Sequence, residues 1–372
     1  MATHNFEFFP MSDYAIEETD RVLHELPELT EGDLRFAFMP DYHYKYIREM
    51  RVSFSNVVHM LNKINEKSKI EFLCLGGDNV GNYPNSKEEH IEMMEDLAKF
   101  FSFTDVPIIT VQGNHDDNSI HSRIAPDAYV CHTESVVPND IQYDCLFSQH
   151  EKIKNFHLAH EKALYGYLDI PSADTRVIFL DSTDVPFILD GDILRYNQQW
   201  NFGYTGRQLS WIATTALADA PENVIFIEHI PFNDQEMENE ENEAPRHNAD
   251  ALNAITKAFR DGESLHITSD HPDFGYDISA DFGGKKHNVI ARIAGHIHID
   301  TARIDRAGFL DITTMLSGRK ASGLLANENG TKFDREPFCK NETAVDIFTV
   351  SPARKKIYIT RYGSGENREI DI

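Results

Sequence analysis

The stretch DLRFAFMPDYH, residues 33–43, shows the pattern around which the sequence is organised. Residues 33–39 are mostly aliphatic and aromatic, which predicts a strand buried on both faces. Asp41 and His43 follow directly after this run. The same succession of an apolar run and a polar block recurs with GGDN (76–79), GNHD (113–116), EHIP (228–231) and GHIH (295–298). Metal-competent side chains therefore follow five predicted strands.

Strands and helices alternate along the rest of the chain. Further strands are predicted at residues 69–75, 106–111, 176–180, 223–227, 289–294 and 308–315. Apolar residues at helical spacing predict helices at 46–67, 87–101, 208–217 and 249–259. Ser86, with Glu89 three residues later, is a capping-box signature for the start of the second helix. This alternation favours an α/β fold with a largely parallel sheet.

No linker rich in Pro, Gly or Ser divides the chain, so residues 1–372 are expected to form a single domain. Alternating apolar and polar side chains around a turn predict a C-terminal β-hairpin at about 345–362. Two segments are expected to be insertions. The first, at about 117–175, is irregular with a helical patch. The second, at about 233–248, begins with a run (233–243) of six acidic residues and no basic one, which indicates a solvated loop.

Charge and composition exclude several classes of protein. Among 372 residues, 35 are Lys or Arg and 61 are Asp or Glu, giving a formal net charge of −26. Such an acidic excess disfavours binding of a nucleic acid polymer, which needs a basic surface. No apolar run approaches the ~18 residues of a membrane span, and the first residues lack a signal-peptide pattern, so a cytoplasmic protein without membrane contact is expected. The four cysteines form no CxxC pair, which disfavours zinc ribbons and fits a reducing compartment.

The residue types in the five blocks are suited to holding two metal ions. Ligands of open α/β sheets bind at the carboxyl ends of the strands, where the blocks are expected. Asp41 and His43, in an extended segment, would point to the same side and offer one cation an oxygen and a nitrogen. The carboxylate of Asp78 can bridge two cations, and Asn114 supplies a neutral oxygen. Two sites of about four ligands each are completed by His229, His296 and His298.

Such a pair of ions carries net positive charge and attracts phosphate. It also lowers the pKa of a bridging water toward neutrality, and two ions about 3.5–4 Å apart can clamp an in-line displacement at phosphorus. His115 is not needed as a ligand, so it can neutralise the transferring phosphoryl group or protonate the leaving oxygen. Asp116 is placed in the sequence to orient His115 by a hydrogen bond. These donor types bind manganese, iron, zinc and cobalt, so the sequence does not select one metal.

PDYH, GGDN, GNHD, the isolated His229 and GHIH together resemble the five-block signature of the calcineurin-like metallophosphoesterase superfamily. The stretch GRQLSWI at 206–212 is similar to a helix of bacterial members. The resemblance implies a four-layer α/β/β/α sandwich with two central mixed β-sheets. It also implies two divalent or trivalent ions of manganese, iron or zinc as cofactors. The implied ligands are Asp41, His43, Asp78 and His298 for the first ion, and Asp78, Asn114, His229 and His296 for the second.

Differences from other branches of the superfamily leave the bacterial phosphodiesterases as the branch that this chain most resembles. Serine/threonine phosphatases carry GDxVDRG and GNHE, where this chain has GGDNVGNY and GNHD. Purple acid phosphatases place a tyrosine ligand where this chain has Gly81, and lipid A precursor hydrolases tend to carry Arg in place of His115.

The expected function is hydrolysis of a small phosphodiester, of the cyclic-nucleotide or glycerophosphodiester type, by a metal-bridging hydroxide. The partner would then be a small phosphate ester. A phosphomonoesterase is the main alternative, because the same core supports it. A nuclease or a non-catalytic scaffold is less favoured, and nothing in the sequence indicates an oligomeric state.

Overall fold

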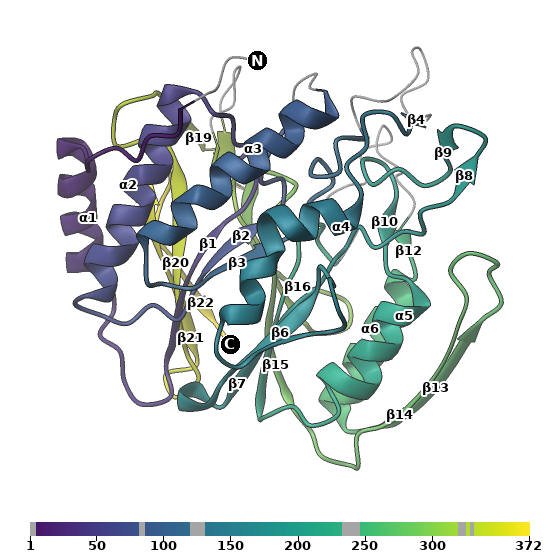
Figure 1. Ribbon diagram of the computed structural model, residues 1–372. Coiled ribbons are helices and arrows are strands. Elements are labelled where there is room, and N and C mark those ends of the chain that lie inside the picture. Colours follow the sequence, from purple (N-terminus) through teal and green to yellow (C-terminus); the bar gives the residue numbers. More distant parts are fainter. Residues whose placement is uncertain (1–4, 82–85, 120–130, 233–245, 319–324, 328–330) are drawn as a thin grey trace.

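The computed structural model describes residues 5–81, 86–119, 131–232, 246–318, 325–327 and 331–372. Over these ranges the chain forms two large β-sheets with helices on their outer faces (Figure 1). The acidic run at 233–243 lies outside the described residues. In the part of the chain that is described, no helix is both long and apolar enough to cross a membrane.

The first sheet has six strands and includes the strand predicted at 33–39. Its spatial order is β22 (Arg368–Asp371), β21 (Lys356–Gly363), β20 (Ala344–Ser351), β1 (Leu34–Met39), β2 (Leu73–Gly76) and β3 (Ile108–Val111). β1, β2 and β3 are parallel, whereas β20 pairs with β1 antiparallel. The C-terminal hairpin consists of β20 and β21 and extends the sheet beside β1. Because β20 of the hairpin is antiparallel to β1, the sheet is mixed and not largely parallel.

The second sheet has nine strands. Its spatial order is β19 (Lys332–Phe333), β18 (Leu325–Asn327), β16 (Ile299–Ile304), β17 (Leu310–Thr313), β15 (Asn288–Ala294), β11 (Asn223–Ile227), β7 (Thr175–Phe179), β6 (Gly166–Ile170) and β5 (Phe156–Leu158). β7, β11, β15 and β17 are parallel, while β16 is antiparallel to β17 and β6 to β7. The segment at 117–175, expected to be irregular, contributes β5 and β6, so it is more regular than predicted.

Aromatic rings fill the space between the two sheets. Phe36 of β1 stacks on Phe72 and Phe348, with ring centroids 4.9 and 5.0 Å apart. Phe179 of β7 meets Phe72 edge-on at 5.5 Å, which joins the two sheets. All four side chains are buried. Burial of each such ring stabilises the fold by roughly 1.5–3 kcal/mol.

Helices cover both outer faces (Figure 1). Those on the six-stranded sheet are α1 (Asp13–Glu25), α2 (Arg48–Asn65) and α3 (Lys87–Lys99), and those on the nine-stranded sheet are α5 (Gly206–Trp211) and α6 (Ala249–Asp261). The capping box at the start of α3 is present, since Ser86 Oγ accepts from Glu89 N and Ser86 N donates to the Glu89 carboxylate. The order of layers is α/β/β/α, so the four-layer sandwich with two mixed sheets is confirmed.

Two helices differ from those predicted from the sequence. α1 is not predicted, and the helix expected at 208–217 begins as α5 and continues as a π-helical turn, Ile212–Ala216. The remaining elements are short: α4 (Asn139–Gln142), β4 (Cys131–His132), β8 (Leu189–Asp190), β9 (Ile193–Leu194), β10 (Phe202–Gly203), β12 (Arg246–His247), β13 (Ser264–Ser269) and β14 (Tyr276–Asp281). β13 and β14 pair antiparallel as a separate two-stranded sheet that packs against α5 and α6.

Phe72→Ala is expected to lower the free energy of unfolding by about 3–5 kcal/mol, because it removes the ring that touches both sheets and leaves a cavity. Ile304→Ala is the control, since Ile304 on β16 is 65% exposed. Its truncation should cost about 0.5 kcal/mol or less. Chemical denaturation of both variants measures the difference. Equal losses would show that Phe72 does not join the sheets energetically.

Candidate metal centre

The five sequence blocks come together where the carboxyl ends of the strands meet. Asp41 follows β1, Asp78 follows β2, Asn114 follows β3, His229 follows β11 and His296 follows β15. Among the described residues, two groups of side chains have ligand atoms within 4.8 Å of one another. The first group is Asp41, His43 and His298, and the second is Asp78, His229 and His296.

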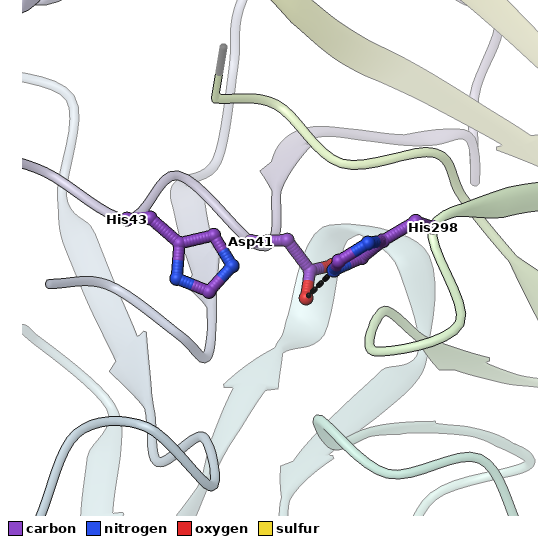
Figure 2. Close-up of side chains that lie close together, drawn as sticks. All are labelled: Asp41, His43 and His298. Carbon is purple, nitrogen blue, oxygen red and sulfur yellow. Dashed lines mark ion pairs between the residues drawn. The ribbon is translucent and has the colours of Figure 1, made fainter. Parts of the chain in front are cut away.

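In the first group, the Asp41 carboxylate lies between two imidazoles (Figure 2). His298 Nε2 lies 3.2 Å from Asp41 Oδ1, and the ring centroids of His43 and His298 are 6.0 Å apart. Both ring nitrogens of His43 are buried, and neither has a hydrogen-bond partner in the described part of the chain. Buried polar atoms are rarely left in this state. The His43 imidazole is therefore suited to a cation that would act as its partner.

In the second group, an amide oxygen lies between two histidines. Asn114 Oδ1 is 3.1 Å from His229 Nε2 and 3.0 Å from His296 Nδ1. His229 Nδ1 donates a hydrogen bond to the carbonyl oxygen of Gly76 at 2.9 Å. This bond fixes the orientation of the His229 ring, so Nε2 is the nitrogen that faces the group and would bind a metal ion.

Asp78 lies between the two groups. Its Oδ1 is 3.3 Å from His229 Nε2, and its Oδ2 is 3.7 Å from His43 Nε2. The backbone N–H of His115 donates to Asp78 Oδ1 at 2.8 Å and holds the carboxylate in place. Gly113 is needed for this approach, because a Cβ there would lie 1.9 Å from Asp78 N. The glycine of GNHD therefore allows the second and third blocks to pack against each other.

Five candidate ligands have left-handed backbones, with φ values of 55° at Asp41, 48° at His43, 51° at Asp78, 67° at His296 and 62° at His298. The extended segment predicted for Asp41 and His43 is therefore wrong. Two hydrogen bonds hold the turn that contains Asp41 and His43. Asp41 N donates to Gly77 O at 2.9 Å, and His43 N donates to Asp78 O at 2.8 Å. Each left-handed residue costs roughly 1–2 kcal/mol, and strain of this kind concentrates at functional sites.

Burial and neighbouring charges set the protonation of these side chains. Burial favours neutral carboxyl groups, but the adjacent histidines outweigh it and lower the pKa of Asp41 and, more strongly, of Asp78. Burial lowers the pKa of His43 to about 3 and that of His296 well below its ordinary value. At neutral pH these carboxylates are charged and these imidazoles neutral, which is the state that binds metal.

His229 behaves differently. Burial works against its protonation, but the carboxylates of Asp78 and Asp41 outweigh burial and raise the pKa of His229 to about 10. Both carboxylates thus attract positive charge to His229 Nε2. A metal ion at this position would supply that charge and displace the proton.

His115 lies beside the Asp78 carboxylate without belonging to either group of three. Its Nε2 is 3.7 Å from Asp78 Oδ2, and its ring centroid is 5.1 Å from that of His43. Burial lowers the pKa of His115. Its side chain is still 15% exposed, so part of the ring is accessible from outside the centre.

Asp116 contacts a different partner from the one predicted. Its carboxylate accepts hydrogen bonds from Asn79 N, Asn79 Nδ2 and Gly113 N at 2.8, 2.9 and 2.8 Å, and from Val80 N at 3.2 Å. No hydrogen bond between described residues joins this carboxylate to the His115 ring. Loop donors occupy both oxygens, so Asp116 ties the GNHD loop to the GGDN loop.

Two contacts beside the centre carry no signal in the sequence. The Phe202 ring lies edge-on to His296, with centroids 5.4 Å apart. Gln112 Nε2 donates to Gln198 Oε1 at 3.0 Å, just before the GNHD block. Neither Phe202 nor Gln198 belongs to a block: Gln198 lies between β9 and β10, and Phe202 is the first residue of β10. Only the folded chain could have identified them.

Comparison with known proteins agrees with this arrangement. The family model described as calcineurin-like phosphoesterase matches residues 34–300. This chain belongs to that family. The match runs from the start of β1 into β16 and includes all five blocks. Membership in the calcineurin-like phosphoesterases makes phosphate-ester chemistry the natural use of the two groups.

A solved structure has the same fold as this chain. The chain is similar to a dimetal phosphatase from Danio rerio, at 13% identity and a TM-score of 0.56, over 91% of this chain and 98% of that one. A conserved uncharacterised protein from Streptococcus pneumoniae, a predicted phosphoesterase, aligns with 93% of this chain and 100% of its own at 8% identity and a TM-score of 0.29. No curated protein sequence gives a significant match.

Asp116→Ala is expected to lower the free energy of unfolding by about 3 kcal/mol or more, because several buried donors lose their acceptor. Asp105→Ala is the control, since Asp105 is exposed; it should change stability by less than about 0.5 kcal/mol. Thermal and chemical unfolding measure both variants. A fully stable Asp116→Ala protein that had lost only activity would assign the carboxylate to catalysis instead.

Proposed function

We propose that this chain is a dinuclear metal-dependent phosphodiesterase similar to the bacterial phosphodiesterases. Its substrate would be a small phosphodiester of the cyclic-nucleotide or glycerophosphodiester type. The observation that carries the proposal is the position of Asp78 between two groups of metal-competent side chains. Two ions sharing one carboxylate form the arrangement used for in-line displacement at phosphorus.

The proposed ligands are Asp41, His43, Asp78 and His298 for the first ion, and Asp78, Asn114, His229 and His296 for the second. The unpartnered nitrogens of His43 and the fixed ring orientation of His229 support this assignment. Carboxylate, imidazole and amide donors suit manganese, iron and zinc, so any of these ions would fit the site.

The chain's own residues would act around the reacting phosphate. When bound, the two ions would polarise the phosphate and lower the pKa of a water molecule. His115, beside Asp78, can donate a hydrogen bond to a phosphoryl oxygen or a proton to the leaving alcohol. The left-handed turns at Asp41 and His298 hold ligand side chains in fixed directions, which keeps the groups ready for substrate.

Charge supports a small substrate rather than a nucleic acid polymer. The net charge of −26 would repel a long polyanion along its whole length. Lys285 and Lys286 precede β15, whereas His296 follows it, so these two lysines lie at the opposite end of the strand from the metal groups. A phosphomonoesterase remains the alternative that substrate tests must separate. Every proposed ligand position is filled, which argues against a scaffold.

Asp78→Ala is expected to remove metal from both sites, because Asp78 is the one proposed ligand that the two ions share. His298→Ala should deplete mainly the first site. His266→Ala is the control, since the His266 side chain is 64% exposed on β13, and it should retain both ions. Mass spectrometry of metal content after loading with Mn²⁺ measures this. Two tightly held ions in Asp78→Ala would refute the shared ligand.

His115→Ala is expected to lower kcat by about 10²–10⁴ while metal content stays intact, because the residue acts on the transition state. If His115 protonates the leaving group, the loss should shrink for aryl esters, whose leaving groups need no proton. An equal loss for aryl and alkyl esters would identify stabilisation of phosphoryl charge. Loss of metal from His115→Ala would make it a ligand.

The substrate class is tested with protein loaded in turn with each metal. We expect kcat/KM to be highest for bis(p-nitrophenyl) phosphate, lower for p-nitrophenyl phosphate and lowest for an oligonucleotide at low salt. A higher value for the monoester would select the phosphomonoesterase. Efficient cleavage of the oligonucleotide would select the nuclease, and no hydrolysis with any metal would refute the proposal.

A further inference from the structure

A separate cavity of about 480 Å³ lies beside the metal groups. None of the proposed metal ligands lines it, but its wall includes Asp117 and Gln198. Asp117 follows the GNHD block directly, and Gln198 is bonded to Gln112 in front of that block. The volume falls within the ~300–1,000 Å³ typical of small-molecule sites.

The cavity is also close to the second metal group through β7 and β11. These strands are parallel neighbours, with Phe179 paired to Ile227. Asp181 of the cavity wall and His229 of the metal group each lie two residues beyond these partners in the sequence. The bond from Ile230 N to Ser182 Oγ, at 2.9 Å, shows that the two loops stay together past the strands.

Three buried or half-buried carboxylates, Asp117, Asp181 and Asp184, lie in the cavity wall, which also includes the basic side chains of His160, Lys162 and Arg207. Asp181 is 1% and Asp117 is 2% exposed. Asp181 Oδ1 accepts from Thr183 N and Oγ1 at 2.9 and 2.8 Å. Asp184 Oδ2 accepts from Thr205 Oγ1 at 2.5 Å and from Gln208 Nε2 at 3.1 Å. Among the described residues, no donor reaches the second oxygen of either Asp181 or Asp184.

No described Lys or Arg forms an ion pair with Asp117, Asp181 or Asp184. Lys162, which also lines the cavity, is paired with Asp144 at 2.8 Å. Burial, with repulsion from Asp184, raises the pKa of Asp181 to about 8. Buried carboxylates without an ion pair are costly, and a cation bound in the cavity would stabilise the charged forms of Asp181 and Asp184.

The chain itself holds these carboxylates in position. Gln208, from the GRQLSWI motif, donates Nε2 to Asp181 O at 2.8 Å and accepts from Asp181 N at 3.0 Å. Thr205, the cap of α5, bonds to Asp184. Neutral donors thus fix both carboxylates, Thr183 that of Asp181 and Thr205 with Gln208 that of Asp184, and leave one oxygen of each for a ligand.

The chemistry of the wall favours an organic cation over a metal ion. Among the described residues, these carboxylates do not form a group with converging metal-ligand atoms. Aromatic rings of Tyr165, Tyr196 and Phe187 also line the cavity, and such rings attract organic cations. A primary ammonium group carries three donors, which matches free carboxylate oxygens better than a quaternary one, which has none.

We propose that this cavity binds a primary ammonium group, which donates hydrogen bonds to the free oxygens of Asp181 and Asp184. Because the cavity lies beside the metal groups, the ammonium group would belong to the alcohol part of the phosphodiester. This step rests on the proposed function. The protein then prefers phosphodiesters of amino alcohols.

Binding is tested on metal-loaded protein with butylammonium and its neutral counterpart 1-butanol. Calorimetry should show at least about tenfold tighter binding of butylammonium, as expected for hydrogen bonds between charged groups. Asp181→Asn and Asp184→Asn should each weaken it by about tenfold or more. Asp277→Asn, whose side chain is 78% exposed on β14, should leave it unchanged. Equal affinity for 1-butanol, or full affinity in both cavity variants, would overturn the proposal.

The carrier is tested with aminoalkyl p-nitrophenyl phosphates and alkyl esters of the same length. Wild-type protein should show a lower KM for the amino ester, and Asp181→Asn should lose this preference. Binding of butylammonium without any preference between esters would overturn the assignment to the substrate and make a free amine the ligand. Hydrolysis of bis(p-nitrophenyl) phosphate without ammonium binding would refute the cavity assignment and leave the phosphodiesterase intact. Ammonium binding without hydrolysis of any diester would refute the phosphodiesterase and leave the ammonium site intact.

Discussion

The geometry of the centre depends on one constraint, namely that the Asp78 carboxylate presents one oxygen to each metal group. Loops after two neighbouring strands must approach it closely to hold it there. His115 N donates to its side chain, and His43 N donates to its carbonyl oxygen. A side chain at Gly113 would collide with its backbone. The glycine of the third block and the left-handed turn of the first both follow from placing this one carboxylate.

Holding that arrangement has an energetic cost that the rest of the fold offsets. Five left-handed ligand residues, at roughly 1–2 kcal/mol each, represent strain comparable to the net stability of a typical domain. The strained turns grow directly out of strands whose aromatic rings, Phe36 and Phe72 among them, are fixed between two sheets. A rigid core next to strained loops keeps the ligand side chains in one geometry before any substrate arrives.

The sequence predicts the position of the candidate ligands better than their local conformation. Each block is recognisable because a strand and its ligand lie within a few residues of one another, so the signal is local. The turn at Asp41 and His43 could not be predicted, because neighbouring strands select its conformation through bonds to Gly77 and Asp78. The role of Asp116 was missed for a similar reason, since its partner Asn79 is 37 residues away.

The same distinction holds for the fold. Long apolar runs such as 33–39 and 223–227 are found within a residue or two of β1 and β11. β5, at three residues, is too short to show a period of its own and is defined by its pairing with β6. The mixed character of the first sheet depends on where the C-terminal hairpin attaches, and only the partner strand β1 decides this.

The pairing of β1 with β20 determines when the centre can be assembled during synthesis. Arg35 Nε of β1 donates to Thr349 Oγ1 of β20 at 2.9 Å, across 314 positions of the chain. The ribosome releases β1 long before β20, so the strand that leads to Asp41 waits with one edge unpaired. Such late, long-range pairing slows folding and exposes a strand edge to aggregation. The block that carries Asp41 and His43 is therefore anchored on both sides only after the C-terminal hairpin has been made.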